Sequence, residues 1–79
     1  MDFIVKGQRY SLSRQDVEER LRDVAPEPVA KHAVYINGRE YPVKQALAES
    51  LSIDRLTINT SQARDILGRL GFELARRGS

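Results

Sequence analysis

The polar residues best suited to recognition chemistry lie in the segment 60–70, which also has the clearest helical spacing. Ser61, Gln62 and Arg64 would fall in the first two turns of such a helix, and Arg69 would follow further along. Arginine can form paired hydrogen bonds to guanine, and glutamine to adenine. Side chains near the start of a recognition helix are the ones that enter the major groove of DNA. The alternative is an ordinary solvated helix face with its charges in surface ion pairs.

A second group of cations surrounds the predicted turn of a β-hairpin. It consists of Lys31, Arg39 and Lys44, and Tyr35 and Tyr41 are interleaved with them. Basic side chains can follow a phosphate backbone, and tyrosine rings can stack on bases. The tyrosines fit equally well as packing partners across two strands. Both interpretations of this segment remain open at the level of sequence.

Residue types that support catalysis or metal binding are scarce. The chain has no cysteine, which excludes disulfides, thiolate metal sites and a cysteine nucleophile. His32 is the only histidine and is expected to be a half-exposed strand residue, while Glu18 and Glu19 are neighbours on a solvated helix face. No glycine pattern matches a phosphate-binding loop or a nucleophile elbow. We therefore predict a non-enzyme with no catalytic residue, metal, cofactor or small-molecule substrate.

Length and charge limit the class of protein further. A chain of 79 residues forms one small domain that buries only roughly 60% of its unfolded surface. Thirteen Lys and Arg residues against eleven Asp and Glu give a net charge of +2. Residues 1–27 carry five cations and six anions (−1), and residues 28–79 carry eight and five (+3). This asymmetry favours a nucleic-acid partner, and no apolar run reaches the length of about 20 residues that spans a bilayer. We expect a cytoplasmic protein with one domain over residues 1–75 and a disordered basic tail over 76–79.

The first third of the sequence predicts a hairpin and a helix. Residues 3–5 and 8–12 are β-prone and flank a glycine, which indicates a hairpin. Ser13 begins a capping box, and the apolar spacing behind it predicts a helix over 14–25. Two prolines then end this helix.

The middle of the sequence contains its strongest turn signal. Asn37-Gly38 accepts the positive φ angles of a type I′ turn and predicts a hairpin of residues 33–36 and 39–41. The proline after the second strand can open a helix over 43–51, whose apolar spacing leaves Gln45 on the outer side. Alternating apolar and polar residues predict a short strand over 56–58.

The last part predicts a helix over 61–70 and a closing strand over 72–75. Asn59, Thr60 and Ser61 can each cap this helix, and Gly71 can stop it. Together these elements indicate an α+β fold: a single small domain with three helices packed on a short, mostly antiparallel sheet with a central β-hairpin. The sheet residues expected in the core are Ile4, Val34, Ile36 and Phe72.

Two segments, INGREYPVKQA over 36–46 and QARDILGRLGFE over 62–73, resemble a small module of actinobacterial and phage proteins. Similar segments accompany DNA-restriction contexts. The resemblance covers over half of the chain and implies that Lys44, Arg64 and Arg69 contact a partner. It implies no particular chemistry.

Two functions follow from the sequence. The first is a non-catalytic module that binds nucleic acid, with DNA as the expected partner, in a bacterial or phage setting. Its expected contact residues are Lys31, Arg39, Lys44, Ser61, Gln62, Arg64 and Arg69. The second is a protein-interaction module, either a regulator or inhibitor that binds a host protein or a homodimer, because a thin core leaves β edges exposed.

Overall fold

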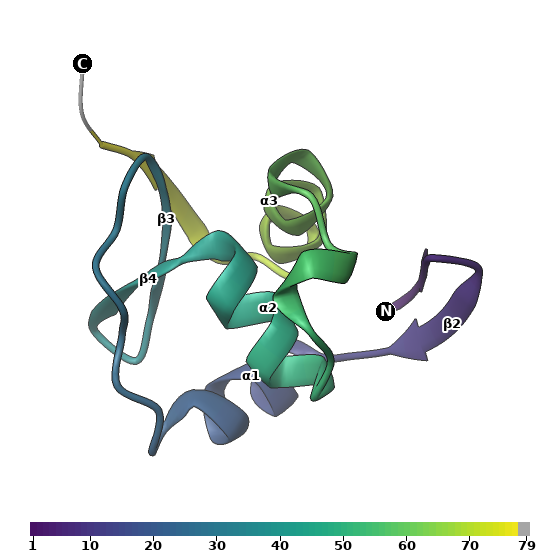
Figure 1. The fold of residues 1–79 in the computed structure, drawn as a ribbon. Coiled ribbons are helices and arrows are strands. Elements are labelled where there is room, and N and C mark those ends of the chain that lie inside the picture. The colour runs from purple at the N-terminus through teal and green to yellow at the C-terminus, as the bar shows by residue number, and fades with distance from the viewer. Residues whose placement is uncertain (78–79) are drawn as a thin grey trace.

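Five strands, three α-helices and one short 3₁₀ helix form the fold of residues 1–77, the part of the chain that the computed structural model describes (Figure 1). In chain order the elements are β1 (Asp2–Val5), β2 (Gln8–Ser11), α1 (Arg14–Leu21), β3 (His32–Ile36), β4 (Arg39–Pro42), α2 (Val43–Leu51), η1 (Arg55–Thr57), α3 (Thr60–Arg69) and β5 (Glu73–Arg76). The predicted α+β class with three helices is confirmed. The strands form two antiparallel sheets, β1–β2 and β4–β3–β5, where we expected one.

The three-stranded sheet has two unlike ends. At one end β3 turns into β4 through Asn37-Gly38, with φ angles of 55° and 75°, which confirms the predicted hairpin turn. At the other end β3 begins and β5 finishes, and His32 pairs with Arg76 there. We call these the turn end and the open end. Figure 1 shows the helices between this sheet and the N-terminal hairpin.

The core lies between the helices and the three-stranded sheet. α2 is the central helix and contacts α1, α3 and the sheet. Val24, Leu51 and Leu70, which the helical spacing also predicted to face inward, are only partly buried. The other apolar residues of these predicted helix faces are buried, as are three of the four expected sheet residues. These buried side chains are Val17, Leu21, Val34, Ile36, Val43, Ala46, Leu47, Ala63, Ile66, Leu67 and Phe72. Within residues 1–77, no helix has the length and apolar character needed to cross a membrane.

The prediction that Ile4 lies in the core is wrong, because its side chain is 60% exposed. Successive side chains of a strand point to opposite faces. Phe3 and Val5 lie on the inward face of β1, where the rings of Phe3 and Tyr10 stack with their centroids 6.1 Å apart. Ile4 is therefore turned outward.

The first helix and the segment after η1 depart from the predicted bounds. α1 ends at Leu21 and not at residue 25. The amides of Arg22 and Val24 donate to carbonyls three residues back, and the Tyr41 hydroxyl bonds to the carbonyls of Leu21 and Val24, so the α-helical bonding does not continue. The predicted strand over 56–58 is wrong, since residues 55–57 form η1. There the Asp54 carboxylate accepts the amide of Leu56 at 2.9 Å, a local turn that replaces strand pairing.

The last helix begins one residue earlier than expected. Of the three candidate caps, Asn59 is the N-cap, because its Oδ1 accepts the amide of Gln62 at 2.7 Å. Its end is as predicted: Gly71 has a φ of 94°, and its amide donates to the Gly68 carbonyl. Strand β5 follows directly and continues to Arg76.

Two residues of the expected tail over 76–79 belong to the folded domain. Arg76 is the last residue of β5, and the Arg77 amide donates to the Lys31 carbonyl. The Arg77 side chain also pairs with Glu40 of β4. Residues 78–79 lie outside the described residues.

Candidate functional site

Basic side chains from four elements gather at the open end of the sheet. Strand alternation places His32 and Arg76, which are register partners, on the same side as the core residues of β3. Arg64 of α3 lies near enough to His32 to influence its protonation, as does Lys31. Lys44 of α2 lines the same hollow as Lys31 and His32. We call these five residues the basic face.

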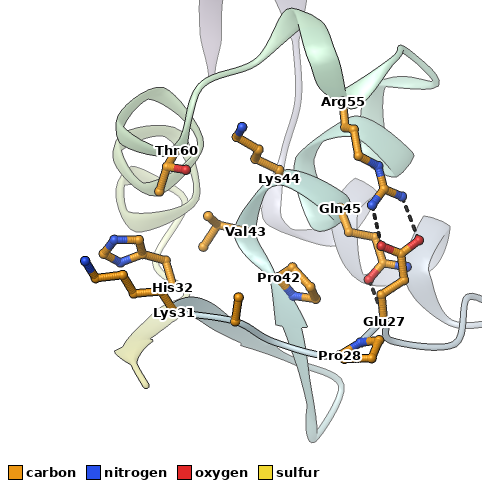
Figure 2. Close-up of a pocket in the computed structure, with 11 residues that line it drawn as sticks. Glu27, Pro28, Lys31, His32, Pro42, Val43, Lys44, Gln45, Arg55 and Thr60 are labelled. Carbon is orange, nitrogen blue, oxygen red and sulfur yellow. Dashed lines mark hydrogen bonds and ion pairs between the residues drawn. The ribbon is translucent and has the colours of Figure 1, made fainter. Parts of the chain in front are cut away.

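A hollow of about 290 Å³ opens within this face (Figure 2). Figure 2 shows Lys31 and His32 together at the start of β3, Thr60 of α3 above them, and Lys44 reaching up from α2. Val43, almost completely buried, lies between these walls. The site is thus built where the starts of β3, α2 and α3 meet.

The surroundings of the His32 ring favour its neutral form. Burial lowers its pKa below the ordinary value, and the positive charges of Arg64, Arg76 and Lys31 lower it further. Its Nδ1 atom is buried and has no hydrogen-bond partner within residues 1–77. The open end therefore presents a neutral, incompletely bonded imidazole surrounded by cations.

Four cations of the basic face lack an acidic partner, in contrast to the four arginines of the domain that form ion pairs. Four arginines elsewhere form ion pairs with a carboxylate: Arg14 with Glu18, Arg55 with Glu27, Arg69 with Asp65, and Arg77 with Glu40. In the described part of the chain no such ion pair involves Lys31, Lys44, Arg64 or Arg76. The positive charge of the face is therefore not compensated by neighbouring acids.

Comparison with protein families places the whole chain in one group. Residues 1–79 match the family described as SCO5918-like. The chain belongs to the SCO5918-like family. This confirms a family relationship and extends it beyond the two segments on which the sequence resemblance rests, to include the N-terminal hairpin and α1. Comparisons with curated proteins and with solved structures gave no match.

Four of the seven predicted contact residues lie at or beside the basic face of this SCO5918-like domain. Lys31, Lys44 and Arg64 belong to it directly. Ser61 lies next to it, since it lines a shallow hollow with Arg64 on the exposed side of α3. The helix and the hairpin, which we treated as separate candidates, thus contribute to one surface.

The other three predicted residues lie elsewhere. Gln62 donates its side-chain amide to the Ile4 carbonyl of β1 at 3.2 Å. Arg69 pairs with Asp65 at 3.2 Å and borders a hollow beside β1. Arg39 lies at the turn end, where its guanidinium donates to the Val24 carbonyl at 3.4 Å.

The predicted hairpin patch with interleaved tyrosines does not form. Tyr41 is completely buried, and its hydroxyl hydrogen-bonds to the carbonyls of Leu21 and Val24 at 2.9 and 2.7 Å. Tyr35 is partly exposed on the opposite side of the sheet, where a hydrogen bond with Glu40 raises the pKa of its hydroxyl. The alternative of cross-strand packing therefore holds for Tyr41.

Sequence reasoning missed two members of the face and the residue that supports its rim. His32 was assigned no role beyond the strand, and Arg76 was assigned to the tail. Gln45 was expected on the outer side of α2, but it is 3% exposed and bonds to the amide of Glu27 at 2.9 Å and the carbonyl of Ala25 at 3.1 Å. It fixes the loop that closes the hollow opposite His32.

Proposed function

We propose that this SCO5918-like protein is a non-catalytic nucleic-acid-binding module that contacts DNA through the basic face. The observation that supports this best is the set of four permanent cations without acidic partners: Lys31, Lys44, Arg64 and Arg76. They come from α2, α3, β5 and the residue just before β3, which are far apart in sequence. Backbone phosphates are the partner that such uncompensated positive charge favours.

Within this face Arg64 is the best candidate for a base edge. Its side chain is exposed, and it extends from the second turn of α3. Gln62 is not included, because its amide already donates to β1. Most of the affinity is then expected from phosphates and little from base recognition.

The salt dependence of binding tests this function. Each neutralised phosphate releases a counterion, so four contacts give a slope of about −3.6 for log K against log salt concentration. Fluorescence anisotropy with a labelled duplex, over several salt concentrations, measures this slope. Absence of binding at low salt, or an affinity indifferent to salt, would overturn the proposal.

A matched pair of double variants tests the location of the contact. Arg64→Ala with Arg76→Ala removes two cations of the basic face and should reduce the slope by about 1.8. Arg39→Ala with Arg69→Ala changes the net charge equally but removes arginines bonded to Val24 and Asp65. We expect this control to retain most of the affinity. Equal losses in the two variants would mean that net charge, and not this face, governs binding.

We further propose that the module acts as a regulatory protein in the cytoplasm of a bacterium or in a phage-infected cell. The support is the sequence pattern of residues 36–46 and 62–73, which resembles a module of actinobacterial and phage proteins with links to DNA restriction. Chromatin immunoprecipitation from the native host is the test. Recovery of no DNA above the untagged control contradicts this setting.

A second candidate function is protein interaction, including self-association. The observation that favours it is the exposure of two large apolar side chains, Leu56 at 83% and Ile4 at 60%. A pull-down with and without nuclease separates the two functions: a partner that resists nuclease favours protein interaction, and one lost on nuclease treatment favours nucleic acid. Sedimentation of the isolated chain tests the homodimer.

A further inference from the structure

We propose that the hollow at the open end holds one phosphate group of the bound nucleic acid, and that His32 hydrogen-bonds to this group and takes up a proton as it binds. This inference rests on the proposed function and adds a specific site and a pH dependence to it. It makes His32, which the contact set above does not use, a ligand of the phosphate.

The walls of the hollow are suited to a phosphate oxygen. Lys31 and Lys44 provide ammonium donors, and Thr60 provides a hydroxyl. Figure 2 shows the Thr60 side chain and the His32 ring on the same side of the hollow, with Lys44 across from them. Within residues 1–77 the buried His32 Nδ1 is unpartnered, and buried polar atoms are normally hydrogen-bonded. Because Nδ1 has almost no exposed surface, the phosphate oxygen would meet the ring at its other nitrogen, Nε2.

The charges around the ring favour an anion over any other ligand. Arg76 faces it from β5, Arg64 from α3 and Lys44 from α2, and Lys31 is the residue just before β3. One carboxylate, that of Glu27, lies at the far rim. Its two oxygens accept hydrogen bonds from Nη1 and Nη2 of Arg55, so the Arg55 charge offsets the negative potential that Glu27 would place at the His32 ring. A metal ion would be repelled by this arrangement.

The same arrangement links binding to proton uptake. In the free protein the neighbouring cations disfavour a further positive charge on the ring. A phosphate group adds negative charge among them and reverses that effect, since a nearby anion favours the imidazolium form. By linkage, a ligand that raises the pKa of a group binds more tightly as the pH falls through that range. Duplex phosphates do not themselves titrate near neutral pH.

The experiment uses the fact that His32 is the only histidine of the chain. In the untagged protein the single imidazole Cε1–H resonance is followed by NMR from pH 5 to 8, alone, with duplex DNA, and with sulfate as a free tetrahedral anion. We expect the duplex to raise the pKa of His32, and the Lys44→Gln variant to show a smaller rise. A change with sulfate but none with the duplex would assign the hollow to free anions and overturn the proposal.

Affinity measurements provide the second readout. Wild-type protein should bind the duplex several-fold more tightly at pH 6 than at pH 8, and His32→Gln should bind equally at both. If the duplex binds but the resonance does not move and the variant keeps the wild-type pH dependence, the phosphate site is wrong and the DNA-binding function stands. If no duplex binds at low salt at either pH, the proposed function itself is wrong.

Discussion

The two ends of the three-stranded sheet use similar side chains in opposite ways. At the turn end, Asn37, Arg39 and Tyr41 all donate to backbone carbonyls of α1 or of the loop that follows it. At the open end, Lys31 and His32 lie beside arginines and a lysine, and no carboxylate in the described residues pairs with these cations. The donors of the turn end are occupied, and those of the open end are available.

This difference separates residues that stabilise the fold from residues that are available to bind a partner. A buried donor bonded to the backbone contributes to the free energy of folding, because its loss leaves acceptors unsatisfied. An exposed cation without a partner contributes little to folding and remains free to meet a phosphate. We therefore expect variants at the turn end to change unfolding and variants at the open end to change affinity.

The largest effect should come from Tyr41→Phe at the turn end. The hydroxyl is the only group removed, and the carbonyls of Leu21 and Val24 lose a donor in a buried setting. The free energy of unfolding should fall by about 1–3 kcal/mol. Urea denaturation measures it, and Tyr10→Phe in the N-terminal hairpin is the control. If Tyr41→Phe lowers the affinity for duplex DNA while the domain stays folded, the turn end also affects binding and the proposed difference between the two ends is wrong.

The last residue of β5, Arg76, and the residue that follows it, Arg77, give a sharper contrast with a smaller expected effect. Arg76 faces His32 at the open end, whereas Arg77 pairs with Glu40 on the other side and holds the pKa of that carboxyl below its usual range. Arg76→Ala should reduce the salt slope of DNA binding by about 0.9 and leave the unfolding midpoint nearly unchanged. Arg77→Ala should lower the midpoint slightly and leave the slope unchanged. Identical behaviour of the two variants would mean that their common net charge explains both.

The turn end was largely predictable from sequence, because its signals are local. Asn37-Gly38 specifies its own turn, and the capping box at Ser13 sets the start of α1. The helical spacing of α3 likewise identified its buried face. In each case the residues that carry the signal are the ones that form the structure.

The open end was not predictable, because it depends on pairing between distant segments. His32 and Arg76 meet only through the register of β3 with β5, and Arg64 joins them only where α3 crosses that sheet. No local pattern encodes this register. The prediction for Gln45 was wrong for a related reason. Helical periodicity placed its side chain outward, but the loop before β3 folds over it.

The smallest expected effect is a dependence of stability on pH that arises at the open end alone. In the unfolded chain His32 titrates near its ordinary value of 6.5, and in the folded domain burial and neighbouring cations lower its pKa. As the pH falls below about 6.5, the unfolded chain binds the proton first, so stability decreases until the folded pKa is passed. The carboxylates with lowered pKa values, Asp16, Glu27 and Glu40, titrate below their ordinary values of 3.8 to 4.5 and act at more acidic pH. The unfolding midpoint should thus be lower at pH 5.5 than at 7.5. His32→Gln should remove this difference in midpoint, and Arg39→Gln at the turn end should retain it. A pH-independent midpoint in the wild type would show that burial and the cations of the open end do not lower the pKa of His32.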